Sequence, residues 1–163
     1  MPLDENSPRD PEKLDDGDKK VLSDIERVGW HLVIIPEDEE GPGFAFTIGL
    51  FHSFDHPEVA VVGQKMELQE YLLNEIGTQV QSGLRFTPTE RYPGLLEGPF
   101  DCGFAEIPKN AYNEYLGYAQ WYYRDREFPA LQCLWPDRQN RIPIDDDFEP
   151  RLRDRQPLMT APG

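Results

Sequence analysis

The stretch "FAFTIGLFHSFDHPEVAVVG", residues 44–63, contains two apolar segments on either side of a polar loop. In the first segment Phe44, Phe46 and Ile48 alternate with other residues, which is the period of a strand with one buried face. The second segment, "EVAVVG", is almost continuously apolar, as in a strand that is buried on both faces. The stretch therefore predicts two strands joined by a loop whose side chains are of reactive types.

Upstream of this stretch, the sequence predicts a helix and a further strand. Asp15 or Asp16 can cap a helix that Gly29 ends, because four apolar residues follow helical spacing between them. The segment "WHLVII" then predicts a strand that Pro36 ends, and the acidic tract "EDEEGPG" turns the chain back into an antiparallel hairpin. The four apolar helix residues are Val21, Leu22, Ile25 and Val28.

Downstream of it, helices and strands continue to interleave. Apolar spacing between Met66 and Val80 predicts a helix that Gly83 ends, followed by a short strand "LRF" and a long loop rich in proline and glycine. A strand "FDCGFAEI", a tyrosine-rich helix over residues 110–124 and a hairpin of "ALQCLW" and "RIPI" complete the pattern. We predict an α+β fold with a mainly antiparallel sheet, open or barrel-like, flanked by about three helices.

The composition predicts one globular domain over residues 15–148. Residues 1–14 are acidic, rich in proline and poor in large apolar residues, so we expect them to be disordered, as we do residues 149–163. The first residues do not form a signal peptide, and no apolar stretch reaches the roughly 20 residues of a membrane helix. We therefore expect a cytoplasmic protein. Cys102 and Cys133 both fall inside predicted strands, where a free cysteine is usually a small buried apolar residue.

The charge is strongly negative: 31 acidic against 16 basic residues give a formal net charge of −15. Such a field repels nucleic acid and anionic membranes, so we expect the protein to bind neither. Two interpretations remain, namely that the acid keeps the protein soluble or that it complements a basic protein partner. We expect a monomer or a homodimer.

The loop between the two central strands carries candidate ligand residues. His52, Asp55, His56 and Glu58 are of metal-ligating types, but Pro57 favours a loop over a helix, and no further motif completes a metal site. We therefore predict no bound metal. A nucleophilic set built from neighbouring residues is also disfavoured, because adjacent side chains rarely face one another and no strand-turn-helix elbow is present.

The tyrosine-rich helix has two interpretations that exposure alone can separate. Tyr112, Tyr115 and Tyr122 recur at helical spacing, which is typical of core packing with hydroxyls that reach the surface. The same spacing is compatible with an aromatic wall for a ligand or with a protein interface.

Two separated motifs, T-I-G-L before a P-E strand and Q-x-x-W-P-D at a later strand end, resemble the bacterial family known as domain of unknown function 4262. The resemblance covers about residues 15–148 and implies a fold but no reaction. The matching residues are Thr47, Ile48, Gly49, Leu50, Pro57, Glu58, Gln132, Trp135, Pro136 and Asp137.

The order of the first strands also resembles flavin-reductase-like split barrels, which bind flavin mononucleotide (FMN). That likeness implies a phosphate site built from backbone amides and polar or basic side chains. The available side chains are those of Thr47, Ser53, Lys65 and Arg85.

Three hypotheses of function follow. The first is a non-catalytic acidic domain, without a cofactor, that recognises a basic protein partner as inhibitor or immunity proteins do. The second is an FMN-binding split-barrel protein, and the third is an enzyme of unrecognised type that uses His52, His56, Glu58 and Asp137. For any site, we predict that the T-I-G-L to P-E loop faces the turn after the Q-x-x-W strand; the alternative is that both are turn residues of a stable fold. The predicted ligand-binding residues are Thr47, His52, His56, Glu58, Trp135 and Asp137.

Overall fold

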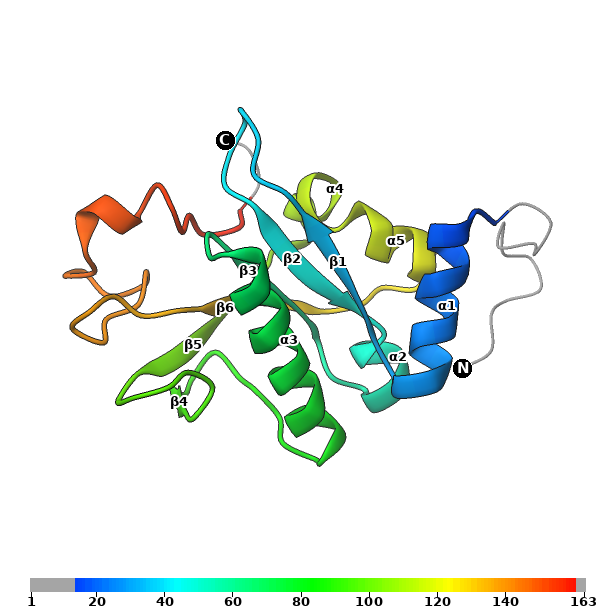
Figure 1. Cartoon of the computed structure of the whole chain (residues 1–163), viewed down its shortest axis with the longest axis horizontal. Helices are drawn as coiled ribbons and strands as arrows, with labels where there is room; N and C mark the ends of the chain where they lie inside the picture. The colour runs from blue at the N-terminus through cyan, green and yellow to red at the C-terminus, as the bar shows by residue number, and fades with distance from the viewer. Residues whose placement is uncertain (1–13, 161–163) are drawn as a thin grey trace.

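A computed structural model describes residues 14–160, which form a six-stranded sheet with helices on both faces (Figure 1). The strands are β1 (His31–Ile35), β2 (Phe44–Ile48), β3 (Glu58–Val62), β4 (Tyr92–Pro93), β5 (Asp101–Glu106) and β6 (Ala130–Leu134). The α-helices are α1 (Asp16–Val28), α2 (Leu50–Phe54), α3 (Met66–Gln81), α4 (Tyr112–Tyr115) and α5 (Gly117–Tyr123). Two short 3₁₀ helices are η2 (Lys109–Ala111) and η3 (Pro150–Leu152).

The sheet has the strand order β1-β2-β3-β6-β5-β4. Every neighbouring pair is antiparallel except β3 and β6, which run parallel with Glu58 beside Ala130. The predicted α+β class and mainly antiparallel sheet are therefore confirmed. The sheet is open, with β1 and β4 at its edges, so the barrel-like alternative is wrong.

More helices form than the three that the sequence predicts. The loop after β2 is helical and becomes α2, and the tyrosine-rich helix is divided in two at Leu116. Leu116 has φ −120° and ψ 28°, outside the helical range, and Gly117 after it has little helical preference of its own.

Helices cover the two faces of the sheet unequally. On one face α3 packs on Ala45, Val59 and Val61 through residues that include Leu72 and Ile76. On the other face α1, α4 and α5 pack on alternate strand residues, among them Phe46 and Ile48. Phe44, Phe46 and Ile48 share one face of β2 as predicted, but the strand is buried on both faces, because Ala45 and Thr47 are buried as well. The two-sided burial of β3 is confirmed, since all five of its residues are buried.

The tyrosines of α4 and α5 divide between core and surface. Tyr112, Tyr122 and Tyr123 are buried in the cluster under α1, whereas Tyr115 and Tyr118 are half-buried at its margin. The core interpretation therefore holds for the three buried rings.

Some predicted elements did not form. "LRF" (84–86) and "RIPI" (141–144) are not strands but irregular chain. The predicted disorder of 149–163 is also wrong for the packed part of that tail, because Gln156 and Met159 are buried. Most of the predicted disorder of 1–14 lies outside the described residues and stays a prediction.

No helix within the described residues is long and apolar enough to cross a membrane. The expected location in the cytoplasm stays a prediction. Cys102 and Cys133 are free and buried, as expected.

Candidate functional site

The T-I-G-L and P-E residues form a buried structural centre around the carboxylate of Glu58. Oε2 accepts hydrogen bonds from the amides of Gly49 (2.9 Å) and Phe51 (3.2 Å), and Oε1 accepts one from the amide of Leu50 (3.1 Å). These are the first amides of α2, which Gly49 itself cannot cap because it has no side chain. Glu58 therefore supplies from the neighbouring strand the negative charge that favours a helix start.

Two hydroxyl groups complete the coordination of this carboxylate. The Thr47 hydroxyl donates to Glu58 Oε1 (2.7 Å) and accepts from the amide of Val59 (3.0 Å). The Tyr123 hydroxyl donates to Glu58 Oε2 and accepts from the amide of His52 (3.1 Å). Burial raises the pKa of the Glu58 carboxyl above its usual range, and the hydrogen bonds from Tyr123, Thr47 and the amides oppose that effect. With each oxygen already accepting at least two hydrogen bonds, the carboxylate has a structural role.

The two histidines of the loop have different environments. His56 is buried, with Nδ1 2.8 Å from the carbonyl of Pro57 and Nε2 3.0 Å from the amide of Phe86. Because Nε2 accepts that hydrogen bond, the neutral Nδ1–H form fits the site, and burial lowers the pKa of His56. His52 is half-buried, with its ring edge-on to Tyr122 at 5.8 Å. No group of three or more ligating side chains that could hold a metal ion is found in residues 14–160.

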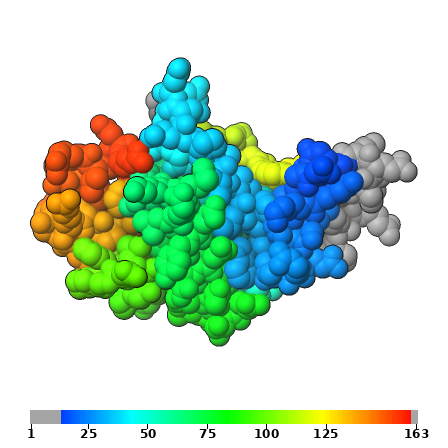
Figure 2. All heavy atoms as spheres, viewed as in Figure 1, coloured from blue at the N-terminus to red at the C-terminus, as the bar shows by residue number. Residues whose placement is uncertain are grey.

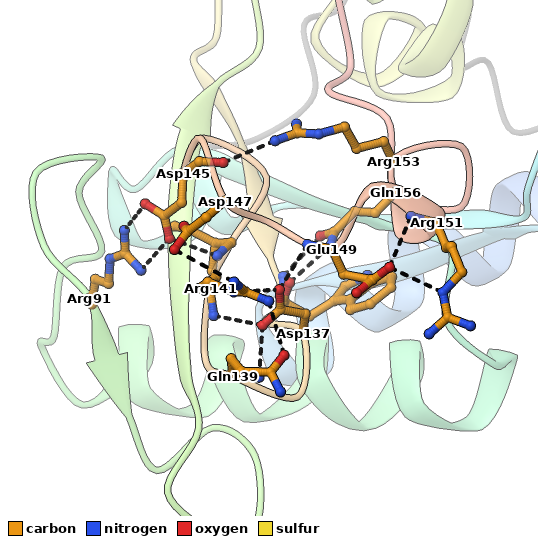
Figure 3. A network of polar contacts seen from close by, with 12 residues as sticks. Arg91, Asp137, Gln139, Arg141, Asp145, Asp147, Glu149, Arg151, Arg153 and Gln156 are labelled. Atoms are coloured by element: carbon orange, nitrogen blue, oxygen red, sulfur yellow. Dashed lines mark hydrogen bonds and ion pairs between the residues drawn. The ribbon is translucent and has the colours of Figure 1, made fainter.

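The Q-x-x-W-P-D residues organise the chain beyond β6 (Figure 3). Trp135 is buried, and its Nε1 donates to the carbonyl of Val62 (2.7 Å). Two glutamine side chains join β6 to the C-terminal segment. The side chain of Gln132 donates to the carbonyl of Pro157 and accepts from the amide of Met159. The side chain of Gln156 accepts from the amide of Trp135 and donates to its carbonyl. This segment, residues 152–159, is hereafter called the C-terminal strap.

Asp137 is the centre of the turn that follows. Its carboxylate accepts from the amides of Gln139, Arg141 and Glu149 and from Arg141 Nε (3.0 Å). Burial acts against ionisation, but these hydrogen bonds lower the pKa of Asp137 below its usual range. Figure 3 shows the same network continuing through Asp145, whose carboxylate pairs with Arg91 (2.5 Å).

The two motifs lie at opposite ends of the sheet. In the parallel pair, Glu58 lies beside Ala130 at the start of both strands, whereas Asp137 follows the end of β6. At about 3.3 Å per residue, Asp137 lies roughly 20 Å from the Glu58 end. The predicted facing arrangement is therefore wrong, and the third hypothesis loses the assembled site that it required. A ligand-binding role for each of the six predicted residues stays untested.

Three of the four side chains proposed to bind a flavin phosphate already make hydrogen bonds to separate groups of the protein. Thr47 bonds Glu58, Ser53 donates to the carbonyl of Gly29 (2.8 Å), and Arg85 donates to the carbonyl of Asp55 (2.5 Å). Lys65 lies at the start of α3. The described residues therefore provide no common phosphate site from this set.

A groove that the sequence did not reveal lies between the β1–β2 hairpin and helices α4 and α5. Figure 2 shows the tip of this hairpin (cyan) projecting from the molecule, with α4 and α5 (yellow-green) behind it. The groove has a volume of about 460 Å³ and includes Pro157 of the C-terminal strap in its lining. Its lining includes apolar and aromatic residues of the strands and of α4: Val33, Ile35, Phe44, Phe46, Val62 and Tyr115.

The charges of the groove are all of one sign. Its described lining includes the carboxylates of Asp38, Glu40 and Glu114 and neither lysine nor arginine. Phe44 and Tyr115 meet edge to face, with ring centroids 5.5 Å apart. Burial and the nearby Glu114 carboxylate raise the pKa of Tyr115. Two signals in the sequence pointed here: the acidic tract of the hairpin, and Tyr115 in the interpretation of the tyrosine-rich helix as an aromatic wall.

Residues 24–149 match the family described as "Domain of unknown function (DUF4262)". No curated protein and no solved structure matches the chain.

Proposed function

The chain belongs to the DUF4262 family, and we propose that this member is a non-catalytic binding protein that holds a basic segment of a partner protein in the groove beside the β1–β2 hairpin. The observation that carries the proposal is that the groove combines apolar lining residues with three exposed carboxylates. These carboxylates, hereafter called the carboxylate rim, are those of Asp38, Glu40 and Glu114. Such a surface suits lysine or arginine side chains, whose aliphatic stems pack on apolar residues while their charged ends stay near water.

The rim is arranged so that its charges remain available. The carboxylate of Asp38 accepts from the amides of Glu40 (2.8 Å) and Gly41 (3.2 Å), which shapes the hairpin tip. Glu40 and Glu114 are exposed, and no hydrogen bond or ion pair from within residues 14–160 engages their carboxylates. Their charge can therefore be offered to a partner.

The aromatic pair adds a second favourable contact. A cation that lies against the face of Phe44 or Tyr115 is attracted by the ring, an interaction of about 0.5–1 kcal/mol at exposed sites. The net charge of −15 acts at longer range, because it increases the rate at which a basic partner meets the groove.

The test is a titration with a synthetic peptide in which lysine alternates with valine, compared with the corresponding glutamate and valine peptide. We expect the basic peptide alone to bind, and to bind more weakly as salt rises from about 0.02 M to about 0.15 M, where screening extends over roughly 8 Å. Binding of both peptides, or affinity that is indifferent to salt, would contradict the proposal.

A pair of double variants separates the groove from the overall charge. Glu40→Gln with Glu114→Gln removes two rim charges and should weaken binding about fivefold, since exposed pairs contribute roughly 0.5 kcal/mol each. Glu67→Gln with Glu70→Gln changes the net charge equally at exposed positions on α3, across the sheet, and should leave the affinity almost unchanged. Equal weakening by both would show that the groove has no special part.

A further inference from the structure

Strand β1 is an edge strand whose outer side has no neighbouring strand among the described residues. Its five residues, "HLVII", include no proline and no permanently charged side chain, although such residues commonly protect exposed strand edges. Val33 and Ile35 of this strand line the groove. The groove is therefore bordered by an edge that remains able to pair with another chain.

The register shows which main-chain groups face outward. Gly63 donates to the carbonyl of Gly43 (2.9 Å), so the odd-numbered residues of β2 direct their hydrogen bonds toward β3. In an antiparallel sheet the even-numbered residues must then bond β1. Their partners in β1 are His31, Val33 and Ile35.

Leu32 and Ile34 therefore present their amides and carbonyls to the open side of β1. No main-chain hydrogen bond outside the regular elements uses either residue within the described part of the chain. Unpaired main-chain groups on an accessible edge are a template for strand addition, in which the added strand gains affinity from main-chain hydrogen bonds.

We propose that the basic segment binds as an additional strand on β1, pairing with Leu32 and Ile34 and directing every second side chain over the groove toward the carboxylate rim. This inference rests on the proposed function and adds the conformation of the partner. It names an extended segment with basic residues at alternate positions, because side chains of a strand alternate between the two faces of a sheet. We infer a basic partner segment from charge, because the described lining of the groove beside this edge has carboxylates and no lysine or arginine.

Amide hydrogen exchange tests the pairing directly in the unmodified protein. On saturation with the lysine and valine peptide, we expect the amides of Leu32 and Ile34 to exchange at least about tenfold more slowly. The amide of Val33 is already paired with β2 and should change less. Unchanged exchange at Leu32 and Ile34 in the saturated complex would overturn the inference.

Two methylated peptides provide a second measurement. One carries N-methyl groups on every lysine and the other on every valine, so each removes the amides of one edge of the extended peptide. Binding should be lost with one pattern and retained with the other, whereas equal retention in both would contradict strand addition.

The failures of the two proposals are distinguishable. If the unmodified peptide does not bind, the proposed function fails and the inference with it. If the peptide binds but leaves Leu32 and Ile34 unprotected, the strand inference alone is wrong. Protection of both amides in the free protein that grows with protein concentration would assign the edge to a second copy of the chain, which also overturns the inference.

Discussion

At the scale of the residue, Glu58 shows how both oxygens of a buried carboxylate can be engaged by hydrogen bonds from the protein itself. Its two oxygens accept hydrogen bonds from three amides and two hydroxyl groups, which belong to the T-I-G-L segment, α2 and Tyr123. Removing one partner from such a network leaves a buried group unsatisfied, which costs more than the hydrogen bond itself contributes. The chemical type of a side chain and its availability to a ligand are thus separate properties.

The variant Glu58→Gln should lower the free energy of unfolding by about 2–4 kcal/mol. The amide group of glutamine would place an N–H donor against donors that now meet a carboxylate oxygen. Urea denaturation measures the loss, and Glu67→Gln is the matched control, since exposed surface changes usually stay within about 0.5 kcal/mol. A Glu58→Gln protein as stable as the control would show that α2 does not need the charge.

The sequence identified the residue types of this centre but not their roles. It placed Thr47, His56 and Glu58 in one segment, because their neighbours predict two strands and a turn. It could not show that the amides of α2 donate hydrogen bonds to Glu58, or that the amide of Phe86 donates a hydrogen bond to Nε2 of His56. Those contacts depend on how separate segments meet in space.

At the scale of the element, α1 and α3 follow local signals closely. Asp15 caps α1 in a capping box with Asp18, and Gly29 ends it with φ 106°. By contrast, the only local signal for the break at Leu116 is the low helical preference of Gly117, and the ordered C-terminal strap has no local signal that predicts it. The strap is held by Gln132 and Gln156, which lie on different parts of the chain.

Helix α3 packs so closely on Trp30 that a methyl group does not fit at Gly77. A Cβ atom at Gly77 would lie 2.5 Å from Cε2 of the Trp30 ring, which Asn74 holds through a 3.0 Å hydrogen bond. Gly77→Ala should therefore destabilise the protein by about 1–3 kcal/mol, although alanine favours a helix by about 1 kcal/mol.

Gly117→Ala is the control for this prediction. It makes the same change at the start of α5, where the added Cβ would meet no atom within 4 Å beyond its chain neighbours and the backbone of its own helix. Thermal or urea unfolding should show unchanged or slightly higher stability for Gly117→Ala. If Gly77→Ala behaves in the same way, the contact with Trp30 is looser than the structure indicates.

At the scale of the whole molecule, negative charge is in excess, and its repulsion opposes compaction. The ion pairs among the described residues, such as Arg91–Asp145 and Arg155–Glu37, are largely surface pairs worth roughly 0–1 kcal/mol each. Salt weakens both the repulsion and the ion pairs. Whether the stability of the protein rises or falls with salt therefore shows which of the two is larger.

We expect the urea midpoint of the free protein to rise as sodium chloride increases from about 0.01 M to about 0.15 M, because screening relieves the repulsion. The Glu67→Gln, Glu70→Gln variant carries two fewer acidic charges and should show a smaller rise. A midpoint that falls with salt would show that the ion pairs dominate.

The strand order of the sheet also has a consequence for biosynthesis. Strand β6 lies between β3 and β5, so β3 obtains its second neighbour only after α3, β4, β5, α4 and α5 have been synthesised. Until Ala130–Leu134 leaves the ribosome, the nascent protein exposes one apolar edge of its most deeply buried strand. Partly folded chains with such unpaired edges aggregate readily. We therefore expect the nascent protein to be most prone to aggregation in the interval between the emergence of β3 and that of β6.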